Sequence, residues 1–172
     1  MTLQFEVLEL IANQSLADLP MNCNSEIYKI FDKCIRIYQE TAAKKDVTLK
    51  LEGDSFKSRV NDKTFPIIAT VLLENAIKYC IRGSEILVRL QLLRDNRCRI
   101  EVNNLADRLR VLPDIFAKGV RGTEDGTGMG YGLFLAQLVA KQHSTEIKFE
   151  RRQYTASVDN YIFRIELNTV PS

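Results

Sequence analysis

The sequence has no tryptophan, one histidine and four cysteines among its 172 residues. The cysteines are far apart and include no Cys-x-x-Cys pair, which predicts reduced thiols in a cytosolic protein and argues against a disulfide framework or a metal site. They are Cys23, Cys34, Cys80 and Cys98. The longest apolar run, Ile67–Leu73, is much too short to span a bilayer, and the N-terminus shows no signal peptide. We therefore expect no membrane contact from this segment.

Neither sign of charge dominates the chain. The formal net charge is +2 at pH 7, so composition gives no electrostatic reason to expect nucleic acid binding. Hydrophobic residues make up 45% of the chain and charged residues 27%, as in ordinary soluble globular proteins. The length is sufficient for one domain with a substantial core. Composition thus argues against several functional classes but does not indicate a function, which has to be inferred from motifs.

The most informative segment is rich in glycine and runs directly into an apolar stretch. Glycine occupies alternate positions from Gly126 to Gly132, and the residues that follow have the apolar spacing of a helix. Alternating glycines let backbone N–H groups converge, and a helix beginning there adds unpaired N–H groups and the positive end of its dipole. This combination is typical of a phosphate site. No Gly-Lys-Ser/Thr follows, which excludes a Walker loop, and no hydrophobic strand precedes the run, unlike a dinucleotide fingerprint.

The second informative segment, Val71–Tyr79, is predicted to be a buried helix. Its only polar side chains are Glu74, Asn75 and Lys78. An asparagine within such a helix costs free energy unless it is hydrogen-bonded or binds something, and alone it would more often be a satisfied core amide. Upstream of the glycine run, however, it resembles the N box of the GHKL ATPase family, in the form found in sensor histidine kinases. Ile115–Gly122 lies between the two and resembles the F box of these kinases.

The ordered set of boxes covers most of the chain, from about Cys23 onward, and several expectations follow from the resemblance. The fold is α+β, a two-layer α/β sandwich with helices on one face of a mixed sheet (the Bergerat fold). The activity is that of a protein histidine kinase, which binds Mg-ATP and delivers its γ-phosphoryl group to a histidine. That histidine would belong to a dimerisation domain outside this chain, so the segment alone would be inactive. A response regulator is the expected second partner, and the location is the cytoplasmic part of a larger sensor.

The resemblance also assigns roles to individual residues. The Asn75 amide oxygen would bind Mg²⁺, Lys78 one helical turn later would neutralise a phosphate, and Tyr79 would pack on the base or ribose unless it is a core residue. The glycine run would hold the β- and γ-phosphates, with Lys118, Arg121 and Thr127 as further contacts from the loop before it. The residues expected to bind the nucleotide are Asn75, Lys78, Tyr79, Asn104, Lys118, Arg121, Thr127, Gly128, Gly130, Tyr131, Gly132 and Leu133.

The chain departs from the family in two places. Asn104 takes the place of the aspartate that accepts a hydrogen bond from the adenine amino group, and Ala106 and Arg108 replace the two glycines that follow. An amide oxygen still accepts this bond, but without charge assistance. The second departure is Val71, which occupies the position of the glutamate that activates water in gyrase-like members. Glu74 is next to Asn75, about 100° around the helix, and points elsewhere. We therefore expect no efficient hydrolysis of ATP by water.

Local patterns separate a short segment over 1–22 from the rest of the chain, 23–172. The resemblance implies that the first is a linker or remnant helix and the second the ATP-binding domain. Asn24 or Ser25 is predicted to cap the first helix of the domain, and Asp62 or Thr64 the helix that carries Asn75. Helices are predicted over 25–44, around Asn75, near 113–116 and from the glycine run to His143. Strands are predicted over 47–51, 57–60, 86–92, 98–102, 147–149 and 161–167.

Two other functions stay open at this point. One is a degenerate family member that acts as a non-catalytic scaffold, which the loss of glycine at Ala106 and Arg108 favours. The other is a free-standing serine kinase of the anti-sigma type. His143, the only histidine, falls at the end of a predicted helix, where a capping role is favoured over phosphate acceptance.

Overall fold

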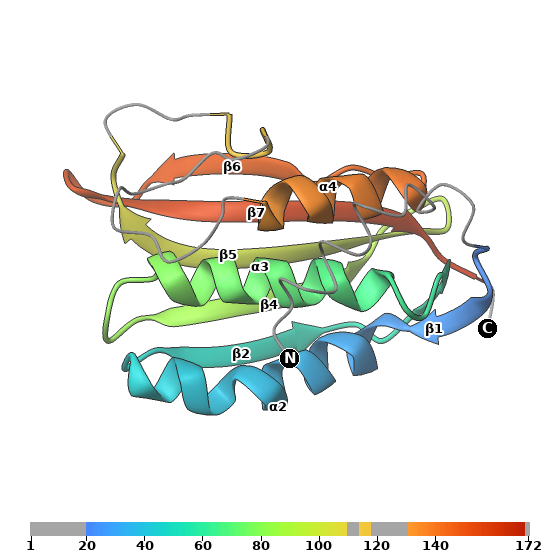
Figure 1. The fold of residues 1–172 in the computed structure, drawn as a ribbon, viewed down its shortest axis with the longest axis horizontal. Coiled ribbons are helices and arrows are strands. Elements are labelled where there is room, and N and C mark those ends of the chain that lie inside the picture. The colour runs from blue at the N-terminus through green and yellow to red at the C-terminus, as the bar shows by residue number, and fades with distance from the viewer. Residues whose placement is uncertain (1–19, 110–113, 118–130, 171–172) are drawn as a thin grey trace.

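The computed structural model describes residues 20–109, 114–117 and 131–170. In this part of the chain three helices and seven strands follow one another (Figure 1). The helices are α2 (Ile27–Lys44), α3 (Phe65–Tyr79) and α4 (Gly132–Gln142). The strands are β1 (Cys23–Glu26), β2 (Thr48–Gly53), β3 (Lys57–Val60), β4 (Glu85–Leu92), β5 (Arg97–Asp107), β6 (Lys148–Gln153) and β7 (Val158–Asn168).

Five of the strands form one mixed sheet. Their order is β2-β4-β5-β7-β6, in which β2 and β4 are parallel and the other neighbours are antiparallel. Because β3 and α3 lie between β2 and β4 in the chain, they form the crossover that a parallel pair requires. All three helices lie on one face of the sheet, as Figure 1 shows. The predicted two-layer fold is confirmed.

The core lies between this sheet and the helices. Strand β5 alternates between buried and partly exposed residues along its whole length, with Cys98, Ile100 and Val102 on the buried side. Helix α3 is the most deeply buried of the three, with Phe65, Ile68 and Leu72 inaccessible to solvent. A helix that is apolar on most of its surface is stable only between other elements, which explains its place between α2 and α4 in Figure 1.

The start of α2 differs from the prediction. Asn24 and Ser25 do not cap this helix, because they belong to β1, which pairs antiparallel with β3 in a separate two-stranded ribbon. The capping position is Glu26, whose side chain makes no cap hydrogen bond. Its carboxylate instead binds Lys29 Nζ at 2.7 Å and accepts a hydrogen bond from Ser55 at 2.8 Å. Pairing with a strand over 30 residues away therefore overrode the local capping signal.

The start of α3 is also organised by a residue that the pattern did not single out. Thr64 occupies the predicted capping position but makes no side-chain cap bond, and Asp62 makes none either. The side-chain oxygen of Asn61 accepts hydrogen bonds from the backbone N–H groups of Lys63 (3.0 Å) and Thr64 (3.1 Å). Asn61 thus forms an Asx-type turn that leads into the helix.

Two further predictions need correction. Strand β5 continues five residues beyond the predicted end, to Asp107, because it pairs with β7 along its whole length, up to the pair Asp107–Val158. The described part of the predicted helix near 113–116 is a turn over 114–117, in which the Ala117 N–H donates to the Asp114 carbonyl at 3.0 Å. The predicted N-terminal helix lies outside the described residues.

Candidate functional site

Helix α3 carries three of the residues predicted to bind nucleotide. Asn75 and Tyr79 are half-buried and Lys78 is exposed, so all three lie at the boundary between the core and the solvent. Lys78 Nζ lies 5.2 Å from the centroid of the Tyr79 ring, within cation–π range. Tyr79 therefore positions the ammonium group of Lys78 on the last turn of α3, one turn after Asn75.

The C-terminal end of α3 is fixed to the sheet. Cys80 forms an isolated antiparallel bridge with Ala106 on β5, and the Ile81 N–H donates to the Leu105 carbonyl at 2.9 Å. Lys45 Nζ donates to the carbonyl of Ile77 at 2.6 Å and also to that of Lys78, which places a cation at the negative end of the helix dipole. Burial lowers the pKa of Lys45. These contacts hold the end of α3 beside the stretch of β5 that carries Asn104.

The glycine run reaches the described part of the chain at the start of α4. Gly132 is the first residue of α4, and a Cβ placed on it would lie 3.5 Å from Cγ1 of Val71, an ordinary packing distance. Val71 lies one turn before Asn75 and is 3% exposed. The Leu135 N–H donates to the Tyr131 carbonyl at 2.9 Å, which closes the first turn of α4. The first turn of α4, with Tyr131, Gly132 and the half-buried Leu133, therefore lies against the helix that carries Asn75.

Asn104 lies on the helix-covered face of β5. It follows Val102 in the alternation of the strand, is 2% exposed, and faces away from the neighbouring Asn103, which is half-buried on the other side. Within the part of the chain that the structure describes, neither its amide oxygen nor its amide nitrogen has a hydrogen-bond partner. An unsatisfied buried amide typically costs about 1–3 kcal/mol of stability, so this one calls for a functional explanation.

Arg108, in the place of the second family glycine, has its own partners. Its Nε and one terminal nitrogen donate to Oδ1 of Asp159 at 3.0 and 2.7 Å, and the terminal nitrogen also donates to the Thr155 carbonyl at 2.9 Å. Asp159 is 2% exposed on β7, and the pair Ala106–Asp159 is the next one along this face from the pair Asn104–Tyr161. The arginine therefore fastens the chain after β5 to the hairpin between β6 and β7.

Glu74 does not take part in this site. Its carboxylate accepts a hydrogen bond of 2.5 Å from the Tyr38 hydroxyl on α2. Burial raises the pKa of Tyr38, and the adjacent Glu74 raises it further. The prediction that Glu74 points away from Asn75 is confirmed, and it leaves Val71 at the position where gyrase-like members activate water.

His143 is the residue that ends α4, and the predicted capping role is confirmed. Nδ1 lies 2.8 Å from the Val139 carbonyl, while Nε2 accepts the Asn61 backbone N–H at 3.1 Å. The ring is 9% exposed and meets Phe65 edge to face, with centroids 5.3 Å apart. Burial lowers the pKa of His143, which favours the neutral imidazole that these two bonds require. Such a histidine joins α4 to the start of α3 and is not accessible as a phosphate acceptor.

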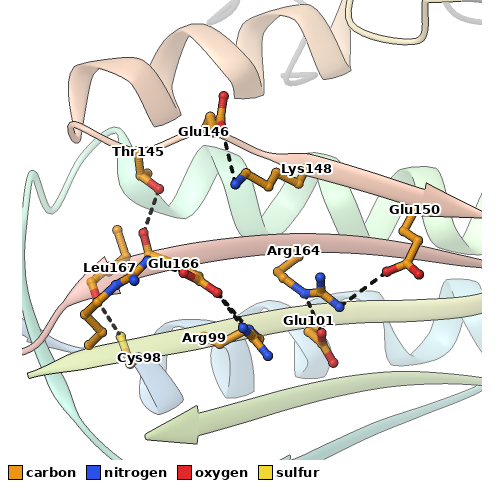
Figure 2. Close-up of polar contacts among 11 residues, drawn as sticks. Cys98, Arg99, Glu101, Thr145, Glu146, Lys148, Glu150, Arg164, Glu166 and Leu167 are labelled. Carbon is orange, nitrogen blue, oxygen red and sulfur yellow. Dashed lines mark hydrogen bonds and ion pairs between the residues drawn. The ribbon is translucent and has the colours of Figure 1, made fainter. Parts of the chain in front are cut away.

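The opposite face of the sheet is a ladder of charged residues (Figure 2). Arg99 binds Glu166 at 2.7 Å, and Arg164 binds Glu101 at 2.7 Å and Glu150 at 3.5 Å. A polar groove of about 440 Å³ lies beside this ladder, lined among others by Lys148, Arg164 and Glu166. Neither Asn75 nor Asn104 lines it, so this groove is separate from the candidate site.

Five of the predicted nucleotide contacts lie outside the described residues: Lys118, Arg121, Thr127, Gly128 and Gly130. The described ones gather around the end of α3, the start of α4 and the middle of the sheet. Sequence reasoning missed Lys45 and Asp159, which hold these elements together. Both act on partners more than 30 residues away, so no local pattern marks them.

Comparison with known families decides the classification of the chain. Residues 60–169 match the family described as histidine kinase-, DNA gyrase B- and HSP90-like ATPases. The chain belongs to this family. The matched range includes the residues of the candidate site described above except Lys45, which follows α2, and the resemblance inferred from the N, F and glycine boxes is confirmed.

Individual relatives point to the histidine kinase branch of the family. The chain is 30% identical over 146 residues to the swarming motility regulation sensor protein RssA of Serratia marcescens, a match that covers 80% of this chain. It spans only 30% of the length of that relative. The chain is thus similar to one segment of a longer sensor protein.

Solved structures agree on the fold. The Acinetobacter baumannii histidine kinase AdeS superposes with a TM-score of 0.71 at 15% identity, covering 97% of this chain and 76% of that one. The mycobacterial sensor histidine kinase MprB superposes with a TM-score of 0.74 at 15% identity, covering 87% of this chain and 99% of that one. Within the described residues no helix is long and apolar enough to cross a membrane.

Proposed function

We propose that the chain binds Mg-ATP and delivers the γ-phosphoryl group to a histidine on a separate dimerisation domain, as one step of two-component signalling. The contact between Val71 and Gly132 carries this proposal, because it places the helix of Asn75 against the first turn that follows the glycine run. Family membership supplies the expectation of ATP, and the unpartnered amide of Asn104 fits a ligand that brings hydrogen-bonding groups to the inner face of the sheet.

The residues present fit a site in which the protein and the phosphates of a nucleotide bind the same Mg²⁺ ion. Mg²⁺ is usually held by one or two protein oxygens together with waters and phosphate oxygens, so the single amide oxygen of Asn75 is sufficient on the protein side. Lys78 neutralises a phosphate oxygen, and the backbone N–H groups of Tyr131, Gly132 and Leu133 bind phosphate at the positive end of α4. Lys118, Arg121, Thr127, Gly128 and Gly130 are proposed to complete this site.

The side chains around Asn75 provide no base that could activate water against the phosphoryl group. Bound ATP supplies the group to be transferred, and the protein contributes positioning and neutralisation of charge. Val71 is apolar and buried one turn before Asn75, and Glu74 is engaged with Tyr38, so neither side chain can activate a water molecule. Transfer then depends on an acceptor histidine, which residues 23–172 do not offer because His143 is buried. We propose residues 1–22 as the linker toward that acceptor domain, with a response regulator as the next partner and the cytoplasm as the location.

Calorimetric titration tests the proposal. ADP and a non-hydrolysable ATP analogue are titrated, with and without Mg²⁺, into the wild type and into Asn75→Ala. We expect micromolar binding of the analogue that depends on Mg²⁺ in the wild type and falls at least about tenfold in the variant, because the protein ligand to the metal is lost. Glu74→Gln is the matched control, since it alters the adjacent side chain but keeps an acceptor for Tyr38; its binding should equal that of the wild type.

Three outcomes would contradict the histidine kinase assignment. Absence of heat for every adenine nucleotide would remove the nucleotide site and leave a scaffold, which the substitutions Ala106 and Arg108 would then explain. Binding without transfer to a supplied histidine domain, in the presence of Mg-ATP, would indicate a non-catalytic binding module. Phosphorylation of a serine on a partner protein would instead support the anti-sigma type of kinase.

A further inference from the structure

The amide of Asn104 is surrounded by groups that leave it unconstrained. Its cross-strand neighbour Tyr161 donates its hydroxyl to the Asp107 carbonyl at 3.3 Å, and the Leu105 carbonyl is taken by the Ile81 N–H. Arg108, the first residue after β5, is engaged with Asp159. Among the described residues nothing therefore fixes which end of the amide is the oxygen and which the nitrogen.

The chemistry of an amide differs from that of a carboxylate at this position. An ionised carboxylate only accepts hydrogen bonds, whereas a side-chain amide offers an acceptor and a donor side by side and exchanges them by rotating about its terminal bond. Adenine presents a 6-amino donor next to the N1 acceptor. Hypoxanthine and guanine present a 6-oxo acceptor next to an N1–H donor. One orientation of an amide complements the first edge, and the opposite orientation complements the second.

We propose that Asn104 reads the six-membered edge of the purine with both amide atoms, so that the pocket accepts 6-oxo purine nucleotides as well as adenine nucleotides. This inference rests on the proposed function, because it concerns the base of the same nucleotide. With adenine, Oδ1 accepts the 6-amino hydrogen and Nδ2 donates to N1. With hypoxanthine, the rotated amide donates to O6 and accepts the N1–H. A carboxylate in this place would accept the 6-amino hydrogen of adenine or the N1–H of hypoxanthine, but it has no donor for adenine N1 or for O6.

Inosine diphosphate is the decisive probe, because it has the 6-oxo edge of guanine without the 2-amino group, whose fit is a separate question. Calorimetry on the whole chain with ADP and IDP, each with Mg²⁺, gives two dissociation constants. For the wild type we expect the IDP value to lie within about tenfold of the ADP value, since each base makes two hydrogen bonds. For Asn104→Leu we expect both dissociation constants to rise by at least about tenfold, because each base loses the same two hydrogen bonds.

Asn103→Leu is the matched control, since it makes the same substitution one residue earlier, on the opposite face of β5; both of its dissociation constants should equal those of the wild type. If Asn104→Leu does not fold, the ratio measured on the wild type alone decides. Tight ADP binding with IDP weaker by more than about a hundredfold would overturn the inference and leave ATP binding intact. Failure of both nucleotides to bind would instead overturn the proposed function, and the inference with it.

Discussion

Polar side chains on the two faces of strand β5 differ in whether they have partners. On the outer face Arg99 binds Glu166 and Glu101 binds Arg164, so each charge has a partner within reach of solvent. On the inner face the strand is apolar until Asn104, whose amide is buried without a partner among the described residues. Water can satisfy an imperfect pair on the outer face, but nothing replaces a missing partner on the inner one. We therefore propose the inner end of the strand, and not its outer face, as the part that binds a ligand.

The largest effect is expected for the ion pair on the inner face. Asp159→Asn keeps the shape of the side chain but removes the charge that holds Arg108. Removing one member of a buried ion pair leaves the charge of the other uncompensated. Because Arg108 is about a third exposed, solvent reduces this cost, and we expect a loss of about 2–3 kcal/mol in the free energy of unfolding. Urea denaturation measures it. A loss below 0.5 kcal/mol, on the order of an ordinary surface substitution, would mean that this pair is no stronger than those outside.

The next effect has the opposite sign. Asn104→Leu replaces an unpartnered amide by an apolar group of similar size, so we expect the free energy of unfolding to rise by about 1–2 kcal/mol. In the same variant ADP should bind at least about tenfold more weakly. Thermal unfolding with and without ADP reports both changes. A destabilised variant would contradict the comparison, since it would show that the amide is already paired in the unliganded protein.

His143 gives a pH dependence of intermediate size. Its pKa in the folded protein lies below the ordinary value of 6.5, so below pH 6.5 the unfolded chain takes up a proton that the folded chain resists. Stability should therefore fall as the pH drops from 6.5 toward the lowered pKa, by up to about 1.4 kcal/mol per pH unit.

Denaturant unfolding of the wild type and of His143→Gln measures this effect. The experiment covers about pH 5 to 8, the range in which histidine titrates. The difference between the two proteins in how the free energy of unfolding changes with pH gives the contribution of the imidazole. NMR can follow the same titration directly, because the chain has one histidine. Equal slopes for the two proteins would contradict the assignment of a neutral, bonded ring.

The smallest effect is expected on the outer face. Hydrogen bonding from Arg99, aided by the charge of Arg97, lowers the pKa of Glu166. Because the arginines are 31% and 51% exposed, the net contribution is small, and Glu166→Gln should cost only about 0–1 kcal/mol. Salt should reduce this cost further, which urea denaturation at low and high ionic strength would show. A cost as large as that of Asp159→Asn would remove the distinction between the two faces.

Local patterns predicted most elements of this fold, and the family resemblance predicted their layering. Alternation along β4 and β5 and the helical spacing of α2 are properties of neighbouring residues, and the structure follows them. What failed was decided by partners distant in sequence. Asn24 pairs with Arg59 in a strand instead of capping a helix, and β5 extends to Asp107 because β7 accompanies it.

The candidate site shows the same limit. Asn75 and Gly132 were found because family resemblance marks them, and the structure places their helices in contact through Val71. The residues that organise these helices, Lys45 and Asn61, have no motif. Lys45 donates to two carbonyls at the end of α3, and the Asn61 N–H donates to the ring of His143, 82 residues away. Similarly, no pattern reveals that Asn104 is unpartnered, because this depends on where Tyr161 and Arg108 direct their own polar groups.

The ribbon of β1 and β3 has a mechanical consequence. Ser58 on β3 bridges Thr169, and the Val170 N–H donates to the Lys57 carbonyl at 2.9 Å, so both ends of the described domain meet on one short strand (Figure 1). Asn104 lies about 23 Å further along the sheet, seven residues from the pair Arg97–Asn168. A force applied at either end of the described domain would therefore reach β3 before it reaches the part of β5 that carries Asn104.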